Sequence, residues 1–272
     1  MPETPTDRAR RFLALHHGDG PLLMPNPWDV GSARLLASLG FEALATTSSG
    51  SAATFGRLDG GVARDEALAH ARALAAAVPV PVSADLEDCF APGPDGVAET
   101  VRLAAETGLA GCSVEDSPGG EGIFERDLAV DRVRAAAEAA HAGPVRLVLT
   151  ARAENFLRGN PDLTDTIERL QAYQDAGADV LFAPGVVDAA DLTTLLGAVD
   201  RPVNVLPRPG APTVAELGAM GVARISVGGS FAWCAYAAVV DAATELRDHG
   251  TYGYAARVPD GLAAARTAFA PG

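Results

Sequence analysis

The sequence contains no lysine, and all 21 of its basic residues are arginines. Schiff-base aldolases, covalent pyridoxal enzymes and P-loop phosphate sites each need a lysine amine, so the composition excludes all three. Cysteine is also scarce, and Cys89, Cys112 and Cys234 are too widely spaced for a zinc or redox motif. Cys112 and Cys234 stand among apolar residues and are predicted to be buried. Cys89, beside an acidic cluster, is the one cysteine with a candidate function.

Other absences concern partners and location. No apolar run approaches about 18 residues without a charge or a glycine, so no membrane span is predicted. Residues 1–5 lack a signal-peptide pattern, and we expect a cytoplasmic protein. The net charge of −14 argues against nucleic acid and anionic membranes as partners. With 272 residues, 48% of them hydrophobic, and no low-complexity linker, the chain is predicted to form one domain over residues 1–272.

Short apolar runs alternate with helical patterns along the chain. Strands are predicted at residues 22–24, 41–45, 80–84, 110–114, 145–150, 179–183, 202–206 and 223–227. A helix over 7–15 precedes them, and helices over 231–247 and 261–269 follow. This alternation predicts an α/β fold, a (β/α)8 TIM-type barrel. The alternative is a doubly wound sheet, but its G-x-G-x-x-G motif is missing after the first strand.

The most informative stretch is Val80–Asp88, a buried-strand pattern that ends in three acids. Because side chains alternate along a strand, Asp85 and Glu87 are expected to point the same way. Two carboxylates about 4 Å apart repel by about 4 kcal/mol at an effective dielectric constant near 20. A shared proton, an arginine or a divalent metal must offset this repulsion, and oxygen ligands favour Mg²⁺ or Mn²⁺ over zinc. Alternatively, the acids begin a solvated loop.

Polar residues also follow most of the other predicted strands. The carboxyl ends of barrel strands meet at one mouth, where active sites lie. We therefore expect these residues to converge with Asp85 and Glu87, and we predict a divalent-metal site at the mouth. The five histidines fall on predicted helices and are expected to be structural or solvated. The residues at the strand ends are Asn26, a hydroxyl-rich loop over 46–51, Glu115, Asp116, Arg152, Glu154, Asn204 and Arg208.

Five short motifs occur in order along the chain: Asn26-Pro27-Trp28-Asp29, Thr47-Ser48-Ser49-Gly50 with Asp59, Asp85-Leu86-Glu87-Asp88, Val114-Glu115-Asp116 and Ala151-Arg152. In order and spacing they resemble the motifs of the isocitrate lyase/phosphoenolpyruvate mutase superfamily. The resemblance implies an enzyme that depends on Mg²⁺ or Mn²⁺ and acts on a 2-oxo acid or its enol. It also implies a homodimer or homotetramer whose C-terminal helical segment, residues 252–272, is exchanged between subunits.

The resemblance further implies a role for each matching residue. Asp85 would bind the metal directly, and Asp59, Glu87 and Glu115 would hold it mostly through water. Arg152 would clamp the substrate carboxylate, and the loop from Ser48 to Gly50 would bind the substrate through hydroxyl and N–H groups. The candidate catalytic residues are Ser48, Asp59, Glu115 and Arg152; the candidate substrate-binding residues are Ser48, Ser49, Gly50, Asp85, Arg152 and Asn204; and the candidate metal ligands are Asp85, Glu87 and Glu115.

Departures from the superfamily's motifs limit the reaction. Isocitrate and methylisocitrate lyases carry a Lys-x-Cys-Gly-His loop after the fourth strand, whereas residues 117–125 contain none of these side chains. We expect water, rather than Glu121 of this loop, to deliver the proton. The sixth strand ends without the histidine of phosphonate-cleaving members. The sequence favours a lyase that cleaves or decarboxylates a 2-oxo acid to a pyruvate-like product. Phosphonopyruvate hydrolase or mutase chemistry, a phosphate-binding barrel using Gly228–Ser230, and a non-catalytic binding protein remain alternatives.

Overall fold

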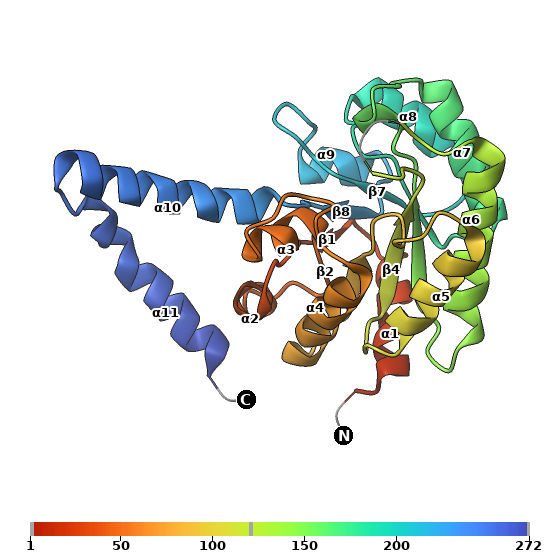
Figure 1. The fold of residues 1–272 in the computed structure, drawn as a ribbon. Coiled ribbons are helices and arrows are strands. Elements are labelled where there is room, and N and C mark those ends of the chain that lie inside the picture. The colour runs from red at the N-terminus through yellow and green to blue at the C-terminus, as the bar shows by residue number, and fades with distance from the viewer. Residues whose placement is uncertain (1–2, 120–121, 271–272) are drawn as a thin grey trace.

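A computed structural model describes residues 3–119 and 122–270. All the strands are parallel and pair in the order β1-β8-β7-β6-β5-β4-β3-β2, so the sheet curls until β1 and β8 are neighbours (Figure 1). Ala45 N–H donates to the Pro25 carbonyl at 3.1 Å and links β2 to the end of β1. This nearly closed (β/α)8 barrel confirms the predicted fold class. The strands are β1 Leu22–Met24, β2 Leu44–Ala45, β3 Val82–Asp85, β4 Gly111–Glu115, β5 Val148–Arg152, β6 Val180–Phe182, β7 Val203–Val205 and β8 Arg224–Ser226.

Helices cover the outside of the barrel. Each predicted strand overlaps an observed one, although β2 and β5 begin later than expected. Within the described residues the helices are α1 Pro5–Leu15, α2 Val30–Ser38, α3 Ser48–Thr54, α4 Arg64–Ala77, α5 Pro94–Ala105, α6 Arg126–Ala142, α7 Leu163–Asp175, α8 Ala189–Ala198, α9 Val214–Ala219, α10 Ser230–His249 and α11 Val258–Phe269, with short 3-10 helices η1 Asn155–Leu157 and η2 Gly253–Arg257.

The predicted hydroxyl-rich loop over residues 46–51 is wrong from Ser48 onward, because Ser48–Thr54 forms α3. Thr47 caps this helix, because its Oγ1 accepts a hydrogen bond from Gly50 N–H at 3.4 Å. The hydroxyl groups that suggested a loop therefore begin a helix. The final helix also begins earlier than predicted, at Val258.

The hydrophobic core has two parts. The larger part lies between the outward faces of the strands and the surrounding helices, where Leu149 and Leu181 are fully buried. The smaller part fills the amino-terminal end of the barrel interior, where Phe12 of α1 packs with Val148 and Val180. α1 therefore closes one end of the barrel and leaves the carboxyl ends of the strands as its mouth.

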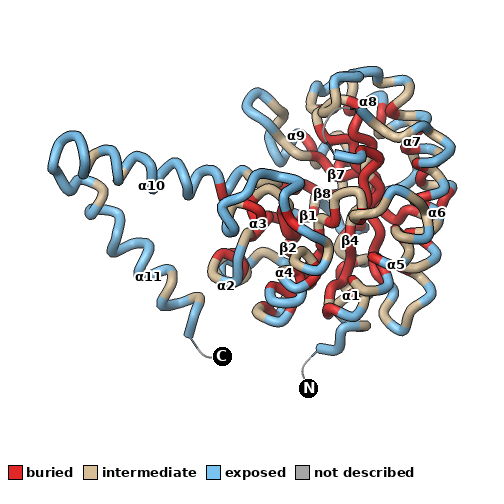
Figure 2. Tube along the Cα trace, in the orientation of Figure 1, coloured by how far each residue is buried: buried red, intermediate tan, exposed pale blue. Residues whose placement is uncertain are grey.

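The last two helices leave the barrel. α10 runs outward and α11 turns back to touch α2 (Figure 1), and both are exposed along most of their length (Figure 2). Ala232 is the buried residue of α10, and α11 has none. Cys234 of α10 is consequently exposed, so the prediction of its burial is wrong, whereas Cys112 is buried as predicted. No helix in the described part of the chain is long and apolar enough to cross a bilayer.

Close packing at the closed end predicts a sensitive glycine. A Cβ at Gly111 of β4 would lie 2.6 Å from the Val148 carbonyl oxygen and 2.8 Å from the Phe12 ring. We expect Gly111→Ala to cost about 1–3 kcal/mol of stability by overpacking, measured as a lower midpoint urea concentration in equilibrium unfolding. The matched control is Gly197→Ala in α8, where no atom lies within 4 Å and which should be neutral or slightly stabilising. Equal effects of both substitutions would contradict this account of the closed end.

Candidate active site

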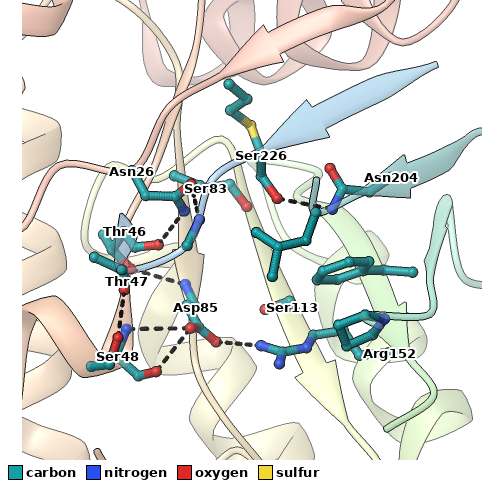
Figure 3. Close-up of a pocket in the computed structure, with 18 of the residues that line it drawn as sticks. Asn26, Thr46, Thr47, Ser48, Ser83, Asp85, Ser113, Arg152, Asn204 and Ser226 are labelled. Carbon is teal, nitrogen blue, oxygen red and sulfur yellow. Dashed lines mark hydrogen bonds and ion pairs between the residues drawn. The ribbon is translucent and has the colours of Figure 1, made fainter. Parts of the chain in front are cut away.

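Two adjoining cavities open at the mouth of the barrel. The inner cavity, of about 190 Å³, reaches into the barrel from the strand ends (Figure 3). The outer cavity, of about 440 Å³, lies above it beside the loops after β3 and β4. Ser48, Asp59 and Arg152 line both cavities. Most of the residues predicted at the strand ends therefore converge on these two cavities.

Arg152, the last residue of β5, is the centre of the site. Its guanidinium lies 3.0 Å from Asp85 Oδ1, 3.1 Å from Glu115 Oε2 and 2.8 Å from Glu154 Oε1. The same group lies over the Phe182 ring, 5.4 Å from its centre. These residues come from β3, β4, β5 and β6, which are neighbours in the sheet. Arg152 thus joins four strand ends through charge and stacking.

The carboxylates around Arg152 outnumber it. Burial raises the pKa of Glu115 to about 8, against the opposing effect of Arg152, and the nearby Glu154 carboxylate raises it further. Burial also raises the pKa of Glu154. Arg158 of the following loop adds a contact to Glu115 at 3.4 Å. Near neutral pH, at least one of these carboxyl groups therefore holds a proton.

Asp85 is fixed from the opposite side by α3. The Ser48 N–H and Oγ donate to Asp85 Oδ2 at 3.2 and 3.0 Å, and the Asp85 N–H donates to Thr46 Oγ1 at 2.9 Å. Ser49 also lines the inner cavity. Gly50 follows Ser49 and packs away from the cavity, and a Cβ at this position would approach Thr47 Cγ2 to 2.6 Å. Gly50 therefore faces packed side chains, and it lines neither cavity.

Glu87 reaches the site from a turn. β3 ends at Asp85, and Glu87, Cys89 and Phe90 have φ angles of 51°, 60° and 55°, a region that residues with a Cβ seldom adopt. The alternation of a strand therefore does not extend to Glu87, and the prediction that it points with Asp85 is wrong. Asp85 lines the inner cavity and Glu87 the outer one.

Arg132 of α6 holds this turn in place. It is almost fully buried, donates to the carbonyl oxygens of Asp88 (2.6 Å) and Ala91, and lies over the Phe124 ring. Cys89 is buried inside the turn, and burial raises the pKa of its thiol well above the usual range. The suggestion that Cys89 has a function beside the acidic cluster is therefore not supported, because its side chain packs in the core.

Other predicted residues fall into different positions. Asp116 lies behind the mouth, where it accepts hydrogen bonds from Tyr173 Oη (2.6 Å) and Glu154 N–H (2.8 Å), so it anchors the chain after β5. Asn204 lines the inner cavity and donates to Ser226 Oγ at 2.9 Å. Arg208 is exposed and lines neither cavity. Glu121 lies outside the described residues.

Several lining residues were not predicted. Arg158 follows β5 by a short loop, and its position gave no sequence signal. Arg224 of β8 lines the inner cavity, and a charged residue inside the apolar run Val222–Val227 was a signal that could have found it. Ser83 and Ser113 line the same cavity from the interior positions of β3 and β4. All three lie deeper than the strand ends to which the prediction was confined.

The site has the donor chemistry of a divalent-metal centre. Burial raises the pKa of Glu87 to about 7, and the charges of Asp85, Asp59 and Asp88 raise it further, which indicates uncompensated negative charge. Among the described residues, no three His, Cys, Asp or Glu side chains converge as a ready cluster. Mg²⁺ usually keeps several waters and takes one or two carboxylates. An oxygen-only site with Asp85 as the direct ligand fits that pattern.

Comparisons with known proteins identify the family and relatives of this chain. Residues 12–247 match the family model described as phosphoenolpyruvate phosphomutase. A crystal structure from Burkholderia cenocepacia J2315, described as a candidate lyase/mutase, is 49% identical, with 98% of this chain and 97% of that chain covered and a TM-score of 0.94. A Mycobacterium tuberculosis protein is 38% identical over 218 residues, 80% of this chain and 81% of that protein. Oxaloacetate acetylhydrolase, crystallised with its product oxalate, is 28% identical, with 98% and 94% coverage and a TM-score of 0.85.

The acid cluster generates a pH-dependent prediction for the metal-free protein. Glutamate in an unfolded chain ionises near pH 4.3, whereas Glu87 in the folded protein has a pKa of about 7. Between these values the folded state holds a proton that the unfolded state has lost, so stability falls as pH rises through this window. We expect Glu87→Gln to raise the melting temperature in EDTA by a few degrees at pH 8 and by less at pH 5.5.

Calorimetry at both pH values measures this difference. Glu138→Gln, on the exposed surface of α6, is the control and should change neither value. A melting temperature at pH 8 that is unchanged or lowered in Glu87→Gln would contradict the proposed excess of negative charge.

Proposed function

The chain belongs to the phosphoenolpyruvate phosphomutase family, within the isocitrate lyase/phosphoenolpyruvate mutase superfamily, and from that premise we propose that it is a metal-dependent lyase that cleaves or decarboxylates a 2-oxo acid. Members of this superfamily are lyases and mutases that act on 2-oxo acid-like substrates. The observation that carries the proposal is the placing of Arg152, Asp85 and Ser48 around one cavity at the barrel mouth.

Arg152 is the proposed substrate clamp. Its planar guanidinium can make two parallel hydrogen bonds to a carboxylate, which a lysine cannot. It is 15% exposed and faces both cavities. A substrate carboxylate would compete with Glu154 and Glu115 for the same N–H groups. Ser48 and Ser49 would bind the substrate's other oxygens from one wall of the inner cavity. Asn204 would bind them from the opposite wall.

Asp85 is the proposed direct metal ligand, with Asp59, Glu87 and Glu115 acting through water. A divalent metal, Mg²⁺ or Mn²⁺, would supply Lewis-acid stabilisation of the negative charge that develops on the substrate's 2-oxo oxygen. Ser48 would keep Asp85 oriented, since it already donates two hydrogen bonds to that carboxylate. Glu115, whose pKa burial raises in the metal-free protein, lines the outer cavity beside this ligand.

Cleavage next to a 2-oxo group leaves an enolate that must be protonated. The residues from 117 to 125 supply no lysine, cysteine or histidine for this purpose, so we assign the donor to water. The absence of a histidine after β6 favours carbon–carbon over phosphorus–carbon chemistry. Phosphonopyruvate hydrolysis or rearrangement remains the second candidate, since the matching family model describes a phosphomutase.

A product assay with several substrates distinguishes these reactions. The protein is incubated with Mg²⁺ or EDTA and oxaloacetate, a methylated malate or phosphonopyruvate. Carbon-13 and phosphorus-31 NMR then separate pyruvate, oxalate with acetate, and phosphoenolpyruvate or phosphate. We expect metal-dependent cleavage of a carbon–carbon bond, absent in Asp85→Asn. Turnover of phosphonopyruvate and of no other compound would contradict the lyase proposal. No turnover of any compound in Mg²⁺ or Mn²⁺ would favour a non-catalytic protein.

The clamp has its own test. Arg152→Lys keeps the charge but loses the bidentate geometry, so kcat/KM should fall about tenfold or more. Arg208→Lys, on the exposed surface, is the matched control and should leave kcat/KM unchanged. If both variants behave alike, the carboxylate is bound by another group.

We also propose a cytoplasmic homodimer or homotetramer in which the C-terminal arm, α10 to α11, packs on a neighbouring subunit. The support is the apolar surface of α10, where Phe231, Trp233 and Val239 are 40%, 46% and 65% exposed. Exposed apolar surface of this extent is typical of protein–protein contacts. The arm touches its own barrel mainly where α11 meets α2.

Sedimentation velocity tests the assembly. Val239→Glu with Val240→Glu places two charges on α10, so we expect a shift to smaller species and a lower melting temperature. Leu58→Glu changes a similarly exposed side chain on the barrel, 84% exposed, and should alter neither. A monomeric parent protein at micromolar concentration would refute the proposal.

A further inference from the structure

The inner cavity continues below the strand ends into a polar part of the barrel interior. Interiors of such barrels are usually filled with bulky aliphatic side chains. Here the polar inward residues at this depth are Ser83, Ser113, Thr150, Asn204 and Arg224. Four of these five residues line the cavity, Thr150 being the exception. Met24 and Ala45 also line the cavity, and they belong to the apolar cluster that continues to the end of the barrel closed by α1.

Arg224 is the charged residue of this polar layer, and it is 3% exposed. Its guanidinium donates to Asn204 Oδ1 at 2.8 Å and to Thr150 Oγ1 at 3.1 Å, and lies 3.2 Å from His16 Nε2. The Nδ1 of His16 faces the Phe12 carbonyl at 2.7 Å, and burial lowers the pKa of His16 to about 3, so this partner is neutral. Within the described residues, Arg224 contacts no carboxylate.

Two other arginines near the site are paired with acids. Arg152 contacts three carboxylates, and Arg169 contacts Asp116 and Asp165. Buried Arg132 donates to backbone carbonyl groups instead, but it lines neither cavity, whereas Arg224 lines the inner one. Burying a guanidinium without a counter-anion is costly, and burial lowers the pKa of Arg224 to about 9. A guanidinium carries five N–H hydrogens, and Arg224, which lines the cavity, has three partners for them among the described residues.

We propose that this cavity floor, formed by Arg224, Asn204, Ser83, Ser113 and Ser226, is a second anion subsite that takes a carboxylate of the substrate. The inference rests on the proposed function and narrows it. Arg224 contacts Thr150, which lies two residues below Arg152 on β5, so the two levels are separated by about 7 Å of strand. A compact dicarboxylate, with one carboxylate at each level, matches this arrangement better than a mono-anion.

The hydroxyl groups of the floor support the same assignment. Ser83 Oγ and Ser113 Oγ line the cavity and have no hydrogen-bond partner in the described part of the chain. Hydroxyls that face a cavity beside a buried cation can donate to a bound carboxylate. Figure 3 shows Ser83 and Ser113 among the residues that line the cavity with Asp85 and Arg152. The floor therefore offers one charge and several neutral donors.

Binding without metal or turnover tests the subsite independently of the reaction. Isothermal titration in EDTA compares malonate, a compact dianion, with acetate, a mono-anion, on the full chain. We expect the protein to bind malonate more tightly. Arg224→Met should weaken malonate binding about tenfold or more and acetate binding less than about threefold, whereas Arg224→Lys should keep most of the preference. An equal loss for both anions, or no loss, would overturn the proposal.

Two further variants separate binding from folding. Thr150→Val removes one hydrogen bond of Arg224 but keeps its charge. It should therefore lower the melting temperature and leave the preference for malonate over acetate unchanged. Ser83→Ala with Ser113→Ala removes cavity-facing donors that hold no protein partner, so it should leave the melting temperature unchanged and weaken malonate several-fold. If the serine pair has no effect on malonate and Thr150→Val abolishes the preference, Arg224 is a structural pin and the floor is not an anion subsite. These experiments measure binding and not turnover. They therefore test the anion subsite even if the lyase proposal is wrong.

Discussion

The sharing of one guanidinium among three carboxylates determines the arrangement of the mouth. Two unscreened carboxylates about 4 Å apart repel by about 4 kcal/mol at an effective dielectric constant of 20. Arg152 contacts Asp85, Glu115 and Glu154 at once, and it thereby allows acids at the ends of adjacent parallel strands to face one cavity. The same constraint makes the site responsive to added charge. An incoming cation reduces the repulsion among the carboxylates, and an incoming carboxylate competes with them for the N–H groups of Arg152.

The scaffold behind the mouth supports this charge cluster. The turn after β3 holds residues in a left-handed conformation that costs of order 1–3 kcal/mol each, and Arg132 and Thr100 bind its carbonyl groups. Asp116 performs a similar task after β5, since it receives the Glu154 N–H. Neither Arg132 nor Asp116 lines a cavity. Their contribution is to fix the backbone on which the cavity-facing acids stand.

The fold and most of the site could be predicted from local patterns. Apolar runs of strand length, separated by helical patterns and glycine stops, are sufficient to indicate eight parallel strands, and strand polarity alone brings Asp85, Glu115 and Arg152 together. Features that depend on contacts between distant segments could not be predicted. Glu87 follows a turn whose conformation is supported from α6, and Cys234 is exposed because its helix leaves the barrel. The pairing of His16 with Arg224 joins residues 208 positions apart, and no local pattern reports it.

The closure of the barrel by α1 restricts how a substrate enters the inner cavity and how products leave it. Phe12 and His16 are almost completely buried beneath the inner cavity, so this cavity is a blind pocket with its opening at the mouth. A molecule with two ends must enter with one end leading, and that end lies deepest when the chemistry begins. If the bond between the two ends is cleaved, the fragment nearer the mouth has a free path and the deeper fragment must follow it. Such a pocket would impose ordered product release, and the deeper product, released last, would compete with the substrate for the free enzyme.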